Sequence, residues 1–244
     1  MTLAAELCSH TLERIQQRFD LREIGSPHIT LTNERMPAPV GSCRLFTGGP
    51  VAKLVYIGLT VPFIQLDSHM LFAFTALDSA VPHFTLDSVF SGEHFAFHLD
   101  LIPRVDLGAN LDYLNAAYQP LTDEFQAVKQ IEGLSPAHLS PRQYAIMSPW
   151  MLVFRATPEA YRQLDTQVNA YLDRWFTMVE QGLPEDVVDS ISDTDLPRRD
   201  ELNRGLIFSR DVDPVWDQIT PLVGQDASEI MRVNLAHNPI VREV

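Results

Sequence analysis

Acidic and imidazole side chains fall inside two segments that otherwise alternate like β-strands. Residues 83–90 (HFTLDSVF) would place four side chains on one face of a strand, namely His83, Thr85, Asp87 and Val89. Residues 95–102 (FAFHLDLI) would likewise place on one face Ala96, His98, Asp100 and Ile102. A carboxyl group at position 87 is a candidate for proton transfer, provided that its face is covered.

The carboxyl group of Asp87 is the most informative of these side chains. If helices cover its face, this group must be hydrogen-bonded, paired or protonated, because burying an unpaired charge is costly. Burial raises the pKa of a carboxyl group, which would make Asp87 a proton donor near neutral pH. Alternatively, solvent wets this face, as often happens on one side of an antiparallel sheet. The pattern alone leaves both interpretations open.

The surrounding elements predict how this face is positioned. Four strand-like segments follow one another too closely for crossover helices, and they are 53–60, 69–76, 83–90 and 95–102. This spacing favours an antiparallel meander. Further elements are expected as helices at 2–19, 158–181, from 213 onward and 225–237, a fifth strand at 149–156, and a loop at 183–200. We therefore predict an α/β (α+β) protein, a three-layer α/β/α sandwich with a central, mostly antiparallel sheet, in one domain over residues 1–244.

The composition narrows the classes of partner and site. A formal net charge of −14 argues against nucleic acid, and no apolar run approaches the length of a membrane span. The two cysteines form no CxxC pair, and the first residues lack the pattern of a signal peptide, so we expect a cytoplasmic protein. The motifs GxGxxG, GxxxxGK(S/T), GxSxG and HExxH are missing. His94 and His98 would lie about 13 Å apart along a strand, too far to share a metal ion, and we predict no metal site.

Three segments resemble a known superfamily. Residues 99–104 (LDLIPR), followed by Asp106, Tyr113 and Tyr118, resemble the red chlorophyll catabolite reductases. Residues 82–87 (PHFTLD) resemble the strand that carries the catalytic acid there, which is Asp in the related ferredoxin-dependent bilin reductases. Residues 199–211 resemble the second acidic segment of the superfamily.

The resemblance implies a fold, a reaction and residue roles. It implies a linear tetrapyrrole held between the sheet and the C-terminal helices, with no bound metal or flavin. Electrons would come singly from a reduced 2Fe–2S ferredoxin, and protein carboxyl groups would supply protons. Asp87 matches the central acid, Asp211 the second acid on a loop, and His69 the partner histidine of the bilin reductases. Asp at position 87 favours the bilin branch, whereas the 99–118 segment favours the chlorophyll-catabolite branch.

Substrate contacts and alternatives complete the set of expectations. His83 and Thr85 share the strand face of Asp87 and are expected to contact the substrate. The propionates of the pigment would be bound by arginine guanidinium groups, for which the candidates are Arg104, Arg142 and Arg155. Each Arg could instead form a solvent-exposed salt bridge. Arg198, Arg199, Arg204 and Arg210 could form a basic patch for an acidic ferredoxin, or a solvated charge run. Two alternatives to the enzyme remain: a tetrapyrrole-binding protein without turnover, and an α/β domain whose Asp87 faces water.

Overall fold

One antiparallel sheet runs through the whole molecule. The computed structural model describes residues 2–25, 28–238 and 240. Over these residues the sheet has nine strands, which are β1 (Arg22–Glu23), β2 (Ile29–Leu31), β3 (Gly41–Gly48), β4 (Val51–Val61), β5 (Leu66–Thr75), β6 (His83–Ser91), β7 (His94–Ile102), β8 (Leu134–Pro136) and β9 (Leu152–Ala156). Their order is β1-β3-β4-β5-β6-β7-β9-β8, and β2 pairs with β3. Every pairing is antiparallel, so the predicted meander of four central strands is confirmed.

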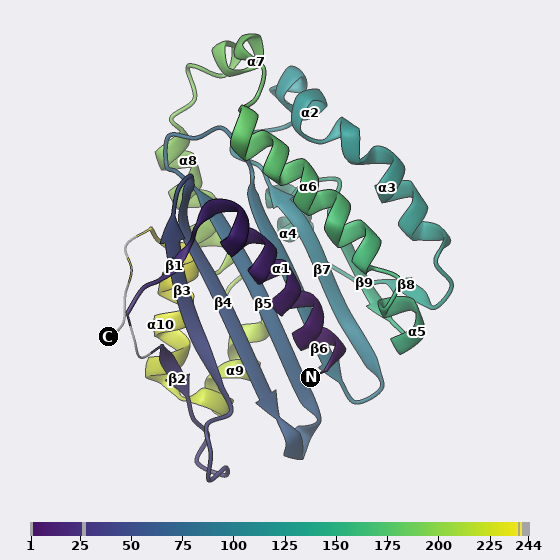
Figure 1. Ribbon diagram of the computed structural model, residues 1–244, viewed down its shortest axis with the longest axis vertical. Helices are drawn as coiled ribbons and strands as arrows, with labels where there is room; N and C mark the ends of the chain where they lie inside the picture. Colours follow the sequence, from purple (N-terminus) through teal and green to yellow (C-terminus); the bar gives the residue numbers. More distant parts are fainter. Residues whose placement is uncertain (1, 26–27, 239, 241–244) are drawn as a thin grey trace.

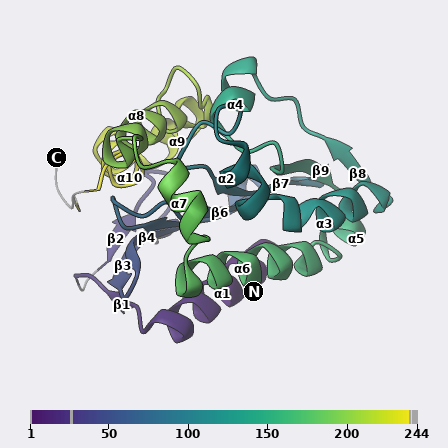
Figure 2. The ribbon, with the colours of Figure 1, turned by 90° about the horizontal axis from the view of Figure 1, so that it is seen from above.

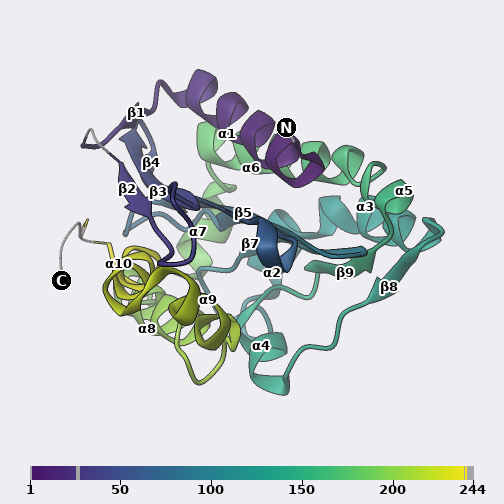
Figure 3. The same cartoon turned by 90° about the horizontal axis from the view of Figure 1, so that it is seen from below.

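Helices cover both faces of the sheet (Figures 1 and 3). The described helices are α1 (Leu3–Phe19), α2 (Leu111–Ala117), α3 (Thr122–Ala127), α4 (Pro141–Ile146), α5 (Pro158–Tyr161), α6 (Asp165–Gln181), α7 (Glu185–Ser190), α8 (Leu196–Ile207), α9 (Val215–Val223) and α10 (Gln225–Ala236). Short 3-10 turns lie at Pro62–Ile64, Gln119–Leu121 and Val128–Gln130. Helices α1 and α6 lie on one side, whereas α8, α9 and α10 lie on the other (Figure 3). The predicted α/β/α sandwich is confirmed.

The two faces of the sheet build two separate apolar cores. Leu12 of α1, Trp175 of α6 and Phe84 of β6 belong to the first core. Phe72 of β5 and Trp216 of α9 belong to the second. Alternation along each strand divides its side chains between these cores, so a polar residue in a central strand is also covered by helices. The C-terminal helices α8, α9 and α10 form the layer on one side of the sheet (Figures 2 and 3), and the side chain of Asp87 in β6 is 26% exposed, so its face is covered only in part.

The helical boundaries follow ordinary capping signals. The side chain of Thr2 accepts a hydrogen bond from the backbone N–H of Ala5 at the start of α1. Thr157 does the same for Ala160, and Pro158 occupies the first turn of α5. None of the helices within residues 2–25, 28–238 and 240 is both long and apolar enough to cross a membrane.

Two predicted boundaries differ from the structure. The predicted helix 158–181 is interrupted between α5 and α6. There the backbone N–H groups of Gln163 and Leu164 donate to carbonyls three residues back, those of Ala160 and Tyr161, as in a 3-10 turn. The predicted loop 183–200 contains α7 and the beginning of α8. Helix α8 lacks a clear apolar period because several of the side chains that it buries are polar.

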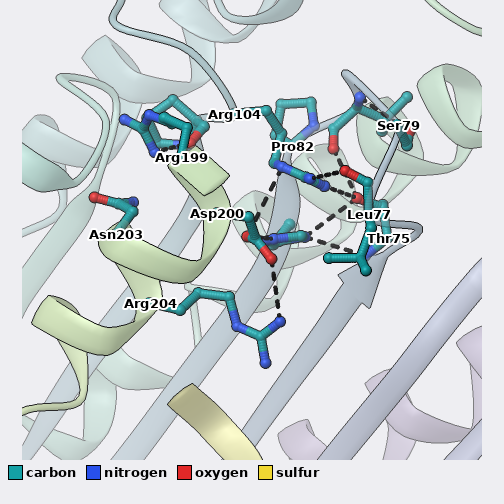
Figure 4. A network of polar contacts seen from close by, with 12 residues as sticks. Thr75, Leu77, Ser79, Pro82, Arg104, Arg199, Asp200, Asn203 and Arg204 are labelled. Atoms are coloured by element: carbon teal, nitrogen blue, oxygen red, sulfur yellow. Dashed lines mark hydrogen bonds and ion pairs between the residues drawn. The ribbon is translucent and has the colours of Figure 1, made fainter. Parts of the chain in front are cut away.

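Those buried polar side chains join α8 to the sheet in a charged network (Figure 4). Asp200 accepts a hydrogen bond from Nε2 of His83 at 2.6 Å, and its other carboxylate oxygen lies 3.3 Å from Arg204. Arg104 lies 3.8 Å from Asp200 and donates to the carbonyls of Ala76 and Leu77. The network therefore fixes α8 above β6, and α8 in turn forms one wall of the second core.

Candidate functional site

A cavity of about 270 Å³ lies between the sheet and the C-terminal helices. Its floor comes from β4 to β7 and β9, and its other walls come from α4, α8, α9, α10 and the loops beside them. Most lining side chains are apolar, and among the described residues none that lines it is Lys or Arg. Such an apolar enclosure with a few polar groups is the usual form of a small-molecule site.

Asp87 and His98 form the polar centre of the cavity floor. They are direct cross-strand partners in β6 and β7, and Nδ1 of His98 lies 3.3 Å from Oδ2 of Asp87. The side chains are only 26% and 14% exposed, respectively. Asp87 Oδ1 and His98 Nε2 are buried, and neither has a hydrogen-bond partner among the described residues. A ligand in the cavity would therefore meet one unpaired oxygen and one unpaired ring nitrogen.

The pKa of His98 is raised above its ordinary value of 6.5. Burial alone would lower the pKa of His98, but the hydrogen bond and negative charge of Asp87, together with the charges of Asp100 and Asp213, outweigh burial. The imidazole consequently retains its proton more readily than a free histidine. His98 can therefore hold a transferable proton at the cavity floor, beside Asp87.

Asp213 brings a second carboxyl group to the cavity from the opposite layer. It lies on the loop before α9, and one of its oxygens accepts a hydrogen bond from the backbone N–H of Val215 at 3.1 Å. Burial raises the pKa of Asp213 from 3.8 to about 6, and the negative charge of Asp87 adds to the shift. A carboxyl group with this pKa is partly protonated near neutral pH, as a general acid must be.

Replacing Asp213 by Asn is expected to stabilise the protein at high pH. Because the folded pKa lies above the unfolded one, the stability that this carboxyl contributes is fully present below pH 3.8 and is lost as pH rises through about 6. Asp213→Asn should therefore raise the free energy of unfolding at pH 8 by on the order of 1–3 kcal/mol, and by less at pH 5. Urea denaturation at both pH values measures the difference.

Asp211→Asn is the matched control for this prediction, because Asp211 is exposed on the same loop. It should change the free energy of unfolding by less than about 0.5 kcal/mol at either pH. An equal effect of the two variants would contradict the burial of Asp213.

The structure brings together only part of the predicted site. Asp87 and Thr85 line the cavity, as their shared strand face predicts. Asp211 does not line it, and the loop presents Asp213 instead, two residues further along. The catalytic roles predicted for these residues stay predictions.

His69 lies on the opposite face of β5 from the cavity. Its ring contacts the hydroxyl of Tyr56 at 2.9 Å and the carboxylate of Asp67 at 3.2 Å, beneath α1. The next residue, Met70, lines the cavity. A shift of one residue along a strand exchanges its two faces, so the position predicted for a partner histidine is displaced to the other side of the sheet. His98 of the neighbouring strand is the imidazole that contacts Asp87.

The other predicted substrate-binding residues are dispersed. His83 and Arg104 are fully buried in the network that anchors α8, and neither lines the cavity. Arg142 is exposed on α4. Arg155 is also exposed, but it pairs in register with the lining residue Ala96 and so points to the cavity side of the sheet.

The predicted basic patch is also reduced by burial. Arg204 is 1% exposed and contacts Asp200, and Arg199 donates to the carbonyl of Pro103 at 2.8 Å. Only Arg198 and Arg210 of the four arginines are exposed. The sequence cluster 198–210 therefore does not form one continuous cationic surface.

Sequence reasoning missed three residues that the cavity brings together. His98 lies on the cavity side of β7. Its pairing with Asp87 depends on the register of β6 and β7, which the sequence pattern does not give. Asp213 precedes a Pro at a helix start, the only local signal of its position. Trp216 has no polar signature in the sequence and enters the cavity from α9.

No group of three or more His, Cys, Asp or Glu within residues 2–25, 28–238 and 240 is arranged to hold a metal ion.

Comparison with known proteins gives a structural likeness. No protein-family model and no curated protein matches the sequence. Among solved structures, phytochromobilin synthase from tomato in complex with biliverdin superposes with a TM-score of 0.75 at 16% sequence identity, covering 96% of this chain and 82% of that one. At this identity the likeness establishes that the two chains share the α/β/α sandwich fold.

Proposed function

We propose that this protein reduces a linear tetrapyrrole, biliverdin or a close relative, with protons from its own side chains. The observation that carries this proposal is the group Asp87, His98 and Asp213 around an apolar cavity between the sheet and the C-terminal helices. The shared fold of a protein that holds biliverdin supports the choice of ligand. It favours biliverdin over a chlorophyll catabolite.

The chemistry needs two electrons and two protons for each double bond reduced. Protonating the conjugated system makes the addition of an electron easier, and an acid in a water-poor cavity holds its proton close to the pyrrole-type nitrogens. Asp87 and His98 would supply that first proton from the cavity floor. Asp213, on the opposite wall, would supply a proton to a carbon at the edge of the pigment, and both sites would be reprotonated from solvent.

The electrons would arrive one at a time from a reduced 2Fe–2S ferredoxin. No hydride donor takes part in this proposed reaction. The protein residues bind the pigment and transfer protons to it. The propionates of the pigment would remain outside the cavity, because no Lys or Arg among the described residues lines it. Arg155 and Arg142, which are exposed, are the candidates to meet them.

The test of this proposal is a turnover assay with purified protein. Biliverdin is added without oxygen, the absorbance is recorded, and reduced ferredoxin is then supplied. We expect a one-to-one complex whose long-wavelength band shifts or bleaches as the pigment is reduced. A complex whose spectrum stays unchanged under reduced ferredoxin would identify a binding protein instead, and the lack of any complex would refute both assignments.

A further inference from the structure

Three residues that line the cavity carry a buried polar side-chain atom without a partner among the described residues. Two of these atoms are Asp87 Oδ1 and His98 Nε2, which belong to the proposed proton donors. The third is the indole nitrogen of Trp216, which the proposed chemistry does not use. An indole N–H can only donate a hydrogen bond, and leaving such a donor buried without a partner is unfavourable.

The position of Trp216 is fixed by the layer opposite Asp87. It is the second residue of α9, directly after the loop that carries Asp213, and only 4% of it is exposed. The other two tryptophans are satisfied within the protein. Trp150 donates to the hydroxyl of Thr122 at 3.1 Å, and Trp175 donates to the carbonyl of Pro82 at 2.9 Å. Of the three tryptophans, the one that lines the cavity is thus the one whose indole N–H has no acceptor among the described residues.

The charges around the cavity restrict what this donor can bind. Asp87 and Asp213 line it, and no described lining residue is Lys or Arg. A carboxylate of the ligand would meet two acidic groups without a Lys or Arg to compensate them, and His98 is already paired with Asp87, so binding a carboxylate there is unfavourable. An uncharged carbonyl oxygen accepts a hydrogen bond without this repulsion.

We infer that the indole N–H of Trp216 binds an uncharged carbonyl oxygen of the ligand and positions the ligand against Asp87 and His98. This inference rests on the proposed function only in identifying that oxygen as a terminal lactam carbonyl of a linear tetrapyrrole. Trp216 is thus a positioning residue, and it selects pigments by their end ring and not by their propionates.

The inference is tested by absorbance titrations of three pigments against matched variants. Trp216→Phe removes the N–H and keeps an aromatic ring, and Trp150→Phe is the control, since it removes an N–H outside the cavity lining. The pigments are biliverdin, its dimethyl ester, and a lactim ether in which the end-ring oxygens are alkylated. We expect Trp216→Phe to weaken binding of biliverdin and of the dimethyl ester about tenfold alike, and to leave the already weak binding of the lactim ether unchanged. Trp150→Phe should stay within about twofold of the wild type.

Three results would overturn or separate the claims. If Trp216→Phe binds biliverdin as tightly as the wild type, the inference is wrong and the proposed function stands. If its effect disappears with the dimethyl ester, the partner of Trp216 is a carboxylate and the inference is again wrong. If the wild type binds no biliverdin, the proposed function itself fails. Should Trp216→Phe fold poorly, benzothienylalanine at position 216, which keeps the shape and lacks the N–H, takes its place with the same expected pattern.

Discussion

Asp87→Asn is expected to bind biliverdin with nearly wild-type affinity and to reduce it at least about 100 times more slowly. Asparagine has the shape of the carboxyl group and can still contact His98, which lies 3.3 Å away. It cannot deliver a proton, and it removes the negative charge that raises the pKa of His98. Both proton sources at the cavity floor would therefore be weakened by one substitution.

The measurements for this prediction are an absorbance titration for binding and a single-turnover assay with reduced ferredoxin for the reaction. Asp211→Asn is the control, because it removes an exposed carboxyl group outside the cavity lining. Because Asp211 is itself the predicted second acid, Glu201→Gln is a further control without a predicted role: Glu201 is exposed outside the cavity lining, and this variant should reduce biliverdin at the wild-type rate. Wild-type turnover by Asp87→Asn would remove Asp87 from the mechanism, while a loss of binding would mean that the residue positions the pigment instead.

Asp200→Ala is expected to lower the free energy of unfolding by about 3–5 kcal/mol, the range for breaking a buried charge network. Asp200 is 3% exposed and meets His83 at 2.6 Å and Arg204 at 3.3 Å. Although burial raises its pKa, the hydrogen bond from His83 and the neighbouring arginines hold the pKa of Asp200 well below its usual range. Removing the carboxylate would leave Arg204 buried without its counter-ion.

The exposed neighbour Glu201 supplies the control for this prediction. Glu201→Ala, on the same helix, should change the free energy of unfolding by less than about 0.5 kcal/mol. Urea denaturation of the two variants at pH 7 measures the difference. Similar losses in both variants would show that the network does not hold α8 on the sheet.

The same network gives the protein a defined sensitivity to acid. Nδ1 of His83 accepts a hydrogen bond from the backbone N–H of Thr75 at 3.1 Å, so the ring is neutral with its proton on Nε2. Burial lowers the pKa of His83 from 6.5 to about 4. The stability that this histidine contributes is therefore present above pH 6.5 and is lost as pH falls from 6.5 towards 4. Wild-type unfolding followed across this interval should show that decline, and His83→Gln should reduce it; a pH-independent wild type would contradict the neutral assignment.

The sheet was predictable because its central strands are local in sequence. Each hairpin between β4 and β7 pairs neighbours along the chain, so alternation and spacing are sufficient to predict the meander. Helix α8 was not predictable in the same way, because Asp200 and Arg204 occupy positions where an apolar period would mark the buried side. A helix that buries charged side chains in a polar network shows no helical period of apolar residues in its sequence.

The lining of the cavity was predictable only in part, and some of the predicted residues lie one or two positions from residues that line it. Alternation places Asp87 correctly relative to its own strand, but only register between strands pairs it with His98. His69 and Met70 differ by one position and face opposite layers. On the loop before α9, the backbone turns Asp213 inwards and leaves Asp211 exposed. Faces, registers and loop directions are tertiary properties, and a single sequence does not determine them.

The most direct measurement is the absorbance spectrum of bound biliverdin as a function of pH, in the wild type and in Asp87→Asn. A bound pigment that keeps the red-shifted band of its protonated form at a pH where the free pigment has lost it would show that the cavity supplies a proton, and the variant should lose that band at lower pH. Identical spectra for the free pigment, the wild-type complex and the variant complex would contradict the account, because no side chain would then be sharing its proton with the pigment.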